Sequence, residues 1–237
     1  MFTNSLKLLG NEEQQRKYLP MADHLNIIGC YAQTELGHGS NVAGLETTAT
    51  LDMTTDEFVI HTPTIRATKF WPGSLGVVST HAIVFARCIS GENDFGVCPF
   101  FVPIRSIENH RPLPGVTVGD VGEKLGYNSV DNGFLSFNKV RIPRENMLSR
   151  FAGVTKEGDL DIKADPRMLY QVMVNTRLNI SYGTALVIIL ACKMATRYAI
   201  CRRQFATIKG STEERKLIDY QTHMAILGTN LANAYVI

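Results

Sequence analysis

The sequence predicts an α+β protein of several domains, with a central antiparallel β-barrel or sandwich flanked by helices and followed by part of a helical bundle. Three observations lead to this prediction. Residues 1 to about 27 have a helical pattern, residues 29 to about 143 form short β-rich runs between turn residues, and the pattern after about residue 167 is helical again. A series of strands without a helix between them favours an antiparallel barrel or sandwich.

The N-terminal pattern predicts two short helices. The Gly10-Asn11 pair interrupts the pattern, and a second helix is expected from Glu12 to Tyr18, ahead of Pro20. The main β-rich runs that follow are LETTATL, EFVIH, HAIVFARCI, CPFFVPI, GVTVGDV and GFLSFNKVRI. HAIVFARCI has apolar residues on both faces, which is typical of a strand that is covered on both sides.

A polar passage from Gly153 to Pro166 separates the β-rich part from the helical part. We expect one long helix from about Arg167 to Phe205 and a second from about Glu213 to the end of the chain, with Ser211 and Glu214 forming a capping box. The most apolar run, Leu178 to Cys192, is too short and too polar to span a bilayer, so it is interpreted as a buried helix.

The composition is that of an ordinary folded protein. Of the 237 residues, 45% are hydrophobic and 19% charged, and the formal net charge of +2 argues against a dedicated nucleic-acid binder. Basic residues concentrate between Lys139 and Lys216, where they could receive phosphates or could equally form a solvated helix surface. The five cysteines are scattered without a C-x-x-C pair, which favours a reducing compartment over a disulfide framework or a zinc site. The N-terminus lacks the features of a secretory signal.

The stretch YAQTELGHGSNV, residues 31–42, brings glycines and short hydroxyl side chains together. Gly37 and Gly39 permit positive φ angles and a close approach to the backbone, so a phosphate or a flat polar ring is the expected ligand. The spacing of Gly37, Gly39 and Gly44 does not fit the dinucleotide fingerprint, and the P-loop, H-E-x-x-H and G-x-S-x-G patterns are absent. His38 is interpreted as a surface loop residue, and no metal site is expected.

The same stretch, extended to YAQTELGHGSNVAGLETTATLD, resembles the start of the middle β domain in the acyl-CoA dehydrogenase and acyl-CoA oxidase superfamily. Further segments agree in sequence order and resemble the peroxisomal acyl-CoA oxidases more closely than the dehydrogenases: KFWPGSLG, FFVPIR, PLPGVTVGDVGEKLGYNSVDNGFLSFNKVRIPRENML and RYAICRRQF. The resemblance covers essentially the whole chain. It implies a small β-barrel between helical domains that holds FAD in an extended conformation.

The resemblance also implies domain boundaries. Residues 1–27 are expected to be the end of a helical domain, residues 28–150 the middle β-barrel domain that binds FAD and acyl-CoA, and residues 165–237 part of a C-terminal helical domain. The family's catalytic glutamate lies in a helical region beyond residue 237. None of the carboxylates present has a matching context, so no catalytic residue is assigned.

The cofactor-binding residues implied in the β domain come from two segments. Thr34 is expected to donate a hydrogen bond to the isoalloxazine ring, and Gly39 and Ser40 are expected to offer donors to the FAD pyrophosphate. Trp71 would wall the flavin, and Gly73 would leave room where the ring meets the backbone. A tight turn without a ligand and a core position for Trp71 are the structural alternatives.

The long helix carries the remaining implied site residues. Arg202, Gln204 and Phe205 occupy places from which the family reaches the FAD of the neighbouring subunit, which implies at least a homodimer. Ser40 and Arg177 are expected to bind the substrate, with Arg177 near the CoA moiety. Solvated charges on a helix surface are the alternative for both arginines.

The implied activity is FAD-dependent oxidation of a fatty acyl-CoA to trans-2-enoyl-CoA, with electrons passed to O2 to give hydrogen peroxide. The chain is expected to be a partial version with little or no activity alone. The alternatives are an acyl-CoA dehydrogenase that uses an electron-transfer flavoprotein, and a non-catalytic module that binds FAD, CoA esters or a longer subunit. A peroxisomal location follows from the resemblance only, since the chain ends in NLANAYVI without an S-K-L type signal.

Overall fold

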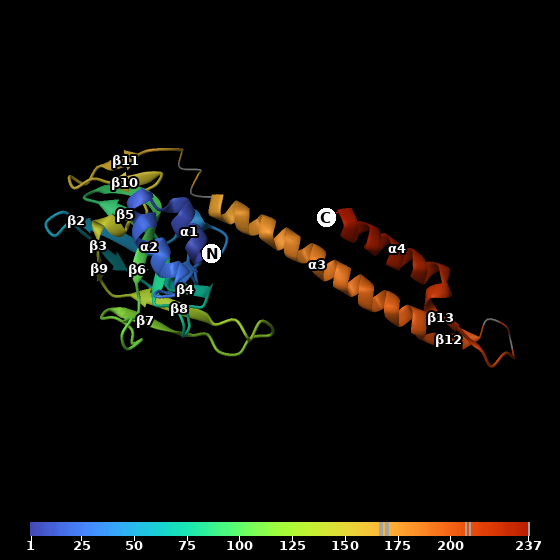
Figure 1. Cartoon of the computed structure of the whole chain (residues 1–237). Coiled ribbons are helices and arrows are strands. Elements are labelled where there is room, and N and C mark those ends of the chain that lie inside the picture. Colours follow the sequence, from blue (N-terminus) through green and yellow to red (C-terminus); the bar gives the residue numbers. More distant parts are fainter. Residues whose placement is uncertain (166–167, 169–170, 207, 209, 237) are drawn as a thin grey trace. The chain divides into compact units, whose positions relative to one another are not determined.

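A computed structural model describes residues 1–165, 168, 171–206, 208 and 210–236 (Figure 1). The chain divides into two compact units, Met1–Val172 and Met173–Ile237. The first unit contains helices and curled sheets, and the second contains two helices with a short hairpin between them. The predicted α+β class and the C-terminal helical segment are confirmed, whereas the three predicted domain ranges remain predictions.

Helices α1 (Phe2–Leu9) and α2 (Glu12–Asp23) open the first unit. Asn11 starts α2 with a capping box: its Oδ1 accepts from the Gln14 N–H at 2.8 Å, and Gln14 Oε1 accepts from the Asn11 N–H at 2.9 Å. The predicted end of this helix ahead of Pro20 is wrong, because α2 continues through the proline. Tyr18 and Ala22, on either side of the proline, are buried in the core, so packing holds the helix where the proline cannot donate a hydrogen bond.

The larger sheet has six strands centred on β5. Its members are β1 (Gly29–Ala32), β2 (Thr48–Asp52), β3 (Glu57–His61), β5 (His81–Ser90), β6 (Asn93–Pro103) and β9 (Val140–Pro143). One edge of β5 pairs antiparallel with β6, and the other pairs in parallel first with β1 and then with β2. A purely antiparallel sheet, as predicted, is therefore wrong for these two pairs. The long segments that separate β1 and β2 from β5 give the chain room for such crossovers.

Two smaller sheets complete the first unit. One contains β4 (Lys69–Gly73), β8 (Asn132–Phe137) and β7 (Val116–Asp120), in that order. The other is a hairpin of β10 (Ala152–Val154) and β11 (Leu160–Ile162), which forms inside the polar passage of the sequence. Its turn includes Gly158, whose φ of +89° is unfavourable for residues with a side chain.

The core of the first unit lies on both faces of β5, as the sequence predicts. Ala82, Val84 and Ala86 face one hydrophobic cluster, shared with the other strands of the sheet. Ile83 and Phe85 face a second cluster, which includes α1 and α2. The two N-terminal helices are thus packed on the sheet by buried apolar side chains.

The second unit differs from the predicted pair of helices. It contains α3 (Gln171–Cys201), a hairpin of β12 (Arg203–Ala206) and β13 (Glu214–Lys216), and α4 (Gln221–Val236). The capping box at Ser211 is wrong because Glu214 lies in β13, where its carbonyl accepts from Arg203 Nη1 at 2.7 Å. The long helix ends at Cys201 instead of Phe205, and its predicted start at Arg167 lies outside the described residues.

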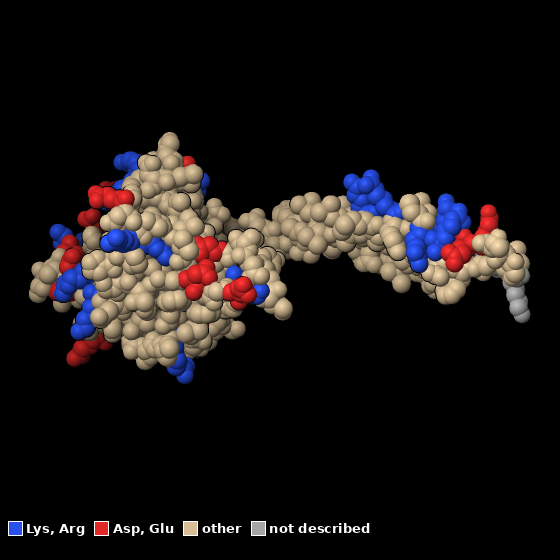
Figure 2. All heavy atoms as spheres, turned by 90° about the horizontal axis from the view of Figure 1, so that it is seen from below, with Lys and Arg blue, Asp and Glu red and all other residues tan. Residues whose placement is uncertain are grey.

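Helix α3 is apolar around its whole circumference, and its central part, which the sequence predicts to be buried, is not buried by the rest of the described chain. Leu178, Leu186 and Leu190 are 55%, 64% and 57% exposed. Figure 2 shows a long stretch of this helical surface without charged side chains. By length and composition α3 could also cross a bilayer, a property that the central helices of large soluble proteins share. A helix of this kind needs apolar neighbours on several sides.

His81, at the start of β5, generates a prediction about pH. It is buried, its ring stacks on Phe101 at 4.9 Å between centroids, and burial lowers its pKa to about 4. In the unfolded chain its pKa is about 6.5, so the unfolded state binds more protons between these two values. We expect the free energy of unfolding to fall as the pH drops through this range, by at most about 3 kcal/mol.

Denaturant unfolding of the full chain at about pH 7 and about pH 4.5 measures this loss. His81→Gln should remove the contribution, whereas His24→Gln, at an exposed histidine, should leave the wild-type pH dependence in place. The same pH dependence in all three proteins would contradict the assignment.

Candidate functional site

The loop between β1 and β2 is fastened to the segment that leads into β4. Three backbone hydrogen bonds hold it: Phe70 N–H to Thr34 O at 3.0 Å, Leu36 N–H to Thr68 O at 3.0 Å, and Gly37 N–H to Arg66 O at 2.8 Å. Thr34 therefore lies beside β4, the strand that carries Trp71 and Gly73. Two of the sequence segments predicted to bind one ligand are neighbours in the fold.

The solvent side of this loop offers unbonded hydrogen-bond donors. Thr34 is half-buried and Ser40 is exposed, and neither hydroxyl has a partner among the described residues. The backbone N–H groups of Gly39 and Ser40 are equally without a partner in this part of the chain. Such groups suit the carbonyls of a flat polar ring and the oxygens of a phosphate.

The two glycines of the loop, Gly37 and Gly39, differ in the space that surrounds them. Neither Gly37 nor Gly39 has a positive φ, so the loop does not use the left-handed backbone that glycine permits. A Cβ on Gly37 would lie 3.1 Å from Arg66 Cβ, so the crossing of these two segments explains that glycine. A Cβ on Gly39 would meet no heavy atom within 4 Å. The open backbone at Gly39 is therefore accessible to a ligand.

A buried ion pair lies directly beneath the loop. Lys69 Nζ donates to Glu35 Oε1 at 2.9 Å, and both side chains are 0% exposed. Burial lowers the pKa of Lys69 to about 8, against the pull of the carboxylate. Burial would raise the pKa of Glu35, but Lys69 and the hydrogen bonds from Glu46 and Thr47 hold it below its ordinary value. The pair stays charged because each member supplies the other's counter-charge.

A second charged cluster forms around Glu46 on the outer side of the loop. Its carboxylate receives Thr64 Oγ1 at 2.9 Å, His38 Nε2 at 3.1 Å and Arg66 Nε at 3.4 Å. The hydrogen bonds from Thr64 and His38 are the largest causes of a lowered pKa at Glu46. His38 is only 15% exposed at its side chain, so it is held inside the loop and does not stand free on the surface.

Trp71 stands at a β-bulge. The register of β4 against β8 shifts between Phe70 and Gly73, and Trp71 has a φ of +83°, which is rare for a bulky residue. Trp71 is 54% exposed, so the alternative of a core tryptophan is wrong. A Cβ on Gly73 would make only an ordinary contact of 3.4 Å with Val130, so packing alone does not require a glycine. A strained backbone beneath an exposed ring is a feature of ligand sites.

The turn after β4 is held from below by Arg105. This buried guanidinium donates to the carbonyls of Leu75 at 3.1 Å, Gly76 at 2.6 Å and Ser79 at 2.6 Å. The bulge itself is fixed by Asn132, whose Nδ2 donates to Trp71 O at 2.7 Å. The exposed Trp71 ring therefore rests on a braced backbone.

The remaining predicted residues lie in the second unit. Arg202 Nη2 donates to Gln204 Oε1 at 3.0 Å, and Phe205 is 71% exposed with a φ of +60°. These three residues meet where α3 ends and β12 begins. Arg177 is exposed near the start of α3, about 37 Å away along a straight helix. Arg177 and Arg202 of one chain therefore cannot contact the same small group.

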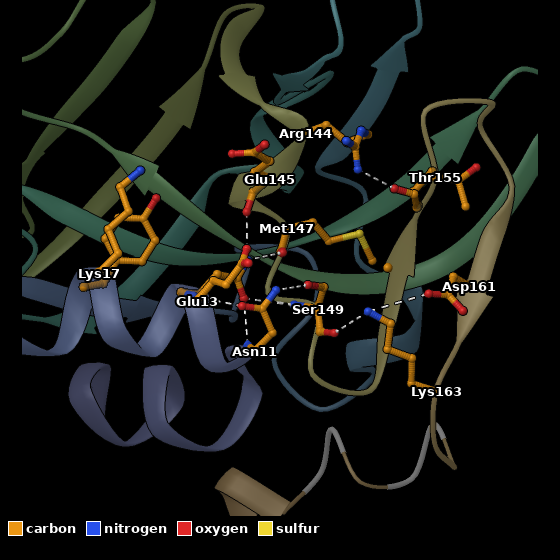
Figure 3. Close-up of a pocket in the computed structure, with 14 residues that line it drawn as sticks. Asn11, Glu13, Lys17, Arg144, Glu145, Met147, Ser149, Thr155, Asp161 and Lys163 are labelled. Atoms are coloured by element: carbon orange, nitrogen blue, oxygen red, sulfur yellow. Dashed lines mark hydrogen bonds and ion pairs between the residues drawn. The ribbon is translucent and has the colours of Figure 1, made fainter.

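A separate hollow lies between α2 and the β10–β11 hairpin (Figure 3). Gln14 Nε2 donates to the carbonyls of Glu145 and Met147, both at 2.7 Å. Asn11 Nδ2 donates to Ser149 Oγ at 2.8 Å. The hollow contains none of the predicted site residues, and these contacts tie α2 to the segment after β9. It is a structural junction in the first unit.

Comparison with known proteins shows which proteins this chain resembles. A model described as the acyl-CoA dehydrogenase middle domain matches residues 30–140, and one described as the acyl-CoA oxidase C-alpha1 domain matches residues 170–237. Peroxisomal acyl-coenzyme A oxidase 1 of Arabidopsis thaliana is 53% identical over 99% of this chain and 36% of its own length. Over almost its whole length the chain is similar to acyl-CoA oxidases.

Further comparisons agree with this similarity. Peroxisomal acyl-coenzyme A oxidase 2 of Mus musculus is 47% identical over 99% of this chain and 34% of its own length. Acyl-CoA oxidase-2 of Caenorhabditis elegans, solved with FAD, ascaroside-CoA and ATP bound, has a TM-score of 0.95 and 42% identity, covering 99% of this chain and 35% of that one. The chain thus spans about a third of the length of these acyl-CoA oxidases. The names of the Arabidopsis and mouse relatives, both peroxisomal, support the predicted peroxisomal location.

Sequence reasoning did not find the residues that support the loop. Glu35 follows Thr34 directly, and Lys69 precedes Trp71 inside a β-forming run, so both were inside the quoted motifs. A lysine at an inward position of an apolar strand is a signal for a buried partner of opposite charge. Arg105, at the end of FFVPIR, gave no comparable signal, because its three acceptors are backbone carbonyls.

The Arg105 brace can be tested by stability. Arg105→Met keeps most of the side-chain volume but leaves three buried carbonyls without their donors, so the free energy of unfolding should fall by about 3 kcal/mol. Arg111→Met, at an exposed arginine nearby in the sequence, should change it by less than about 0.5 kcal/mol. Urea unfolding of the full chain measures both variants. Equal losses at the two positions would contradict the proposed brace.

Proposed function

We propose that this chain forms the FAD-binding part of an acyl-CoA oxidase of the peroxisome, which oxidises fatty acyl-CoA to trans-2-enoyl-CoA and passes the electrons to O2 to give hydrogen peroxide. The hydrogen bond from Phe70 N–H to Thr34 O carries the proposal, because it sets the unbonded Thr34 hydroxyl beside the bulge that bears Trp71. The similarity to acyl-CoA oxidases supports the same reaction.

Of the proposed FAD-binding residues in the first unit, some are assigned to the flavin ring and the others to the pyrophosphate. FAD, when bound, supplies the hydride acceptor and the route of the electrons to oxygen. For its ring we assign the Thr34 hydroxyl as a donor, with Trp71 as a wall and Gly73 as the place of close approach. For its pyrophosphate we assign Gly39 and Ser40, whose N–H groups are unbonded in the described chain. A ligand with a flat polar ring and a phosphate group fits these donors.

We propose that the active assembly is at least a homodimer, in which Arg202, Gln204 and Phe205 reach the FAD of the other subunit. Gln204 orients the exposed Arg202 guanidinium, which keeps further N–H groups for a pyrophosphate. The Phe205 ring is not covered by its own unit. Both features favour contact with a molecule outside the chain.

The substrate and the domain ranges complete the proposal. We assign Ser40 and Arg177 to the CoA ester. We also keep residues 1–27 as the end of one helical domain, 28–150 as the FAD-binding and acyl-CoA-binding domain, and 165–237 as part of a second helical domain. The apolar circumference of α3 supports the last assignment, since such a helix is stable in water only among other helices.

We propose that the isolated chain does not catalyse the dehydrogenation. This reaction needs a free carboxylate to remove the α-proton. Near Thr34 the chain has Glu35, which is paired with Lys69, and Glu46, which is bound by His38 and Arg66. We therefore assign no catalytic residue. The same observation favours a second candidate, a non-catalytic FAD-binding or CoA-ester-binding module that pairs with a longer subunit.

FAD binding by the full chain tests the site assignment. Titration should quench the flavin fluorescence, and Thr34→Val should weaken binding about fivefold, because one hydrogen bond of about 1 kcal/mol is lost. Thr50→Val, at an exposed position of β2, should bind FAD as the wild type does. A colourless protein after gel filtration with excess FAD would overturn the assignment.

The activity of the isolated chain can be tested with palmitoyl-CoA under air. The FAD-loaded chain should release no hydrogen peroxide above a protein-free blank, because Glu35 and Glu46, the carboxylates of the Thr34 loop in the described chain, are both held in ion pairs. A full-length acyl-CoA oxidase serves as the positive control in the same peroxide assay. Release of peroxide by the chain itself would show that a base has been overlooked.

A further inference from the structure

The Glu35–Lys69 pair makes more hydrogen bonds than an ion pair requires. Lys69 Nζ donates to Glu35 Oε1 at 2.9 Å, to Phe85 O at 2.6 Å and to Gln33 O at 3.2 Å. The Glu35 carboxylate accepts from Glu46 N–H at 2.8 Å, and from Thr47 N–H at 3.0 Å and Thr47 Oγ1 at 2.6 Å. The pair thus joins the loop to β4, to β5 and to the segment that enters β2.

Thr34 lies at the centre of these contacts without taking part in them. The ammonium group of Lys69 binds the carbonyl of the residue before Thr34 and the side chain of the residue after it. Phe70, the residue after Lys69, donates its N–H to Thr34 O. The backbone of Thr34 is therefore fixed on both sides and at its own carbonyl, while its hydroxyl stays unbonded to the described chain.

A buried ion pair is a costly way to stabilise a fold. Apolar residues of similar volume often give equal or greater stability, because two charges lose their hydration on burial. A charged pair with a full set of hydrogen bonds does, however, fix directions that apolar packing leaves loose. This suggests that the pair serves the geometry of the loop in addition to its stability.

We propose that Glu35 and Lys69 are positioning residues that fix the Thr34 hydroxyl at the flavin ring beside Trp71, and that they set the affinity for FAD through Thr34. The proposal rests on the proposed function, since it takes Thr34 as a flavin contact. Neither Glu35 nor Lys69 touches the cofactor, because both side chains are fully buried.

The test combines two near-isosteric changes. Removal of one charge should destabilise the fold strongly, because the other charge stays buried without its partner. The double variant Glu35→Gln/Lys69→Met removes both charges and should regain much of the lost melting temperature. We nevertheless expect it to bind FAD about tenfold more weakly than the wild-type chain, since the loop is no longer fixed.

The deciding measurement is the effect of Thr34→Val in two backgrounds, with FAD dissociation constants from fluorescence titration of the full chain. In the wild type this change should cost about fivefold in affinity. In the double variant it should cost less than about twofold, because the hydroxyl is no longer held in place. The matched control is Asp52→Asn/Arg141→Met, a partly exposed ion pair of 3.0 Å, in which Thr34→Val should again weaken FAD binding about fivefold.

The outcomes distinguish a failure of the positioning role of Glu35 and Lys69 from a failure of the proposed FAD binding. Equal costs of Thr34→Val in both backgrounds, or wild-type affinity in the double variant, would overturn the positioning role alone. Failure of the wild-type chain to bind FAD would overturn the proposed function and this proposal with it. If the double variant does not fold, Thr47→Val provides the same comparison, because it removes the 2.6 Å hydrogen bond to Glu35 and leaves both charges in place.

Discussion

The arrangement of the ligand loop depends on the buried contact between Lys69 and Glu35. Each charge must be fully hydrogen-bonded in a medium from which water is excluded, so the segments that provide its partners have little freedom to move. These segments are the loop, the entry to β2, the strand β4 and the strand β5. A connection between two strands thereby becomes as well fixed as the sheet beneath it.

On this fixed support the chain leaves an unusual set of groups open. The hydroxyls of Thr34 and Ser40 are unbonded in the described chain, a Cβ at Gly39 would stand free, and Trp71 holds an exposed ring on a strained backbone. Each feature alone occurs in ordinary loops. Together, on a rigid frame, they describe a preformed surface for a polar, partly aromatic ligand, which agrees with a flavin site in an acyl-CoA oxidase.

In contrast to the well-supported loop of the first unit, the main helix of the second unit is largely uncovered by the described chain. Helix α3 exposes large apolar side chains on all sides, whereas the charged and polar residues Arg202 and Gln204 gather where it ends. The chain spans 36% of the length of its Arabidopsis relative. The exposed apolar surface of α3 agrees with the proposed assembly, in which other helices or a second subunit cover it.

The sequence by itself determined the features that depend on neighbouring residues. The order of helical and β-rich regions and the burial of β5 on both faces followed from local patterns, and the resemblance to acyl-CoA oxidases followed from motifs in a fixed order. It also singled out Thr34, Gly39, Ser40, Trp71 and Gly73 for one ligand, and the structure brings their two segments together.

Only the tertiary structure decided the features that depend on distant residues. The parallel pairing of β1 and β2 with β5, the course of α2 through Pro20 and the β12–β13 hairpin arise because packing outweighs local preference. The pairing of Glu35 with Lys69 joins residues 34 positions apart, so neither residue's own sequence context reveals it. A local sequence pattern shows which side chains are expected to be buried. Only the folded chain shows which charged side chains form an ion pair.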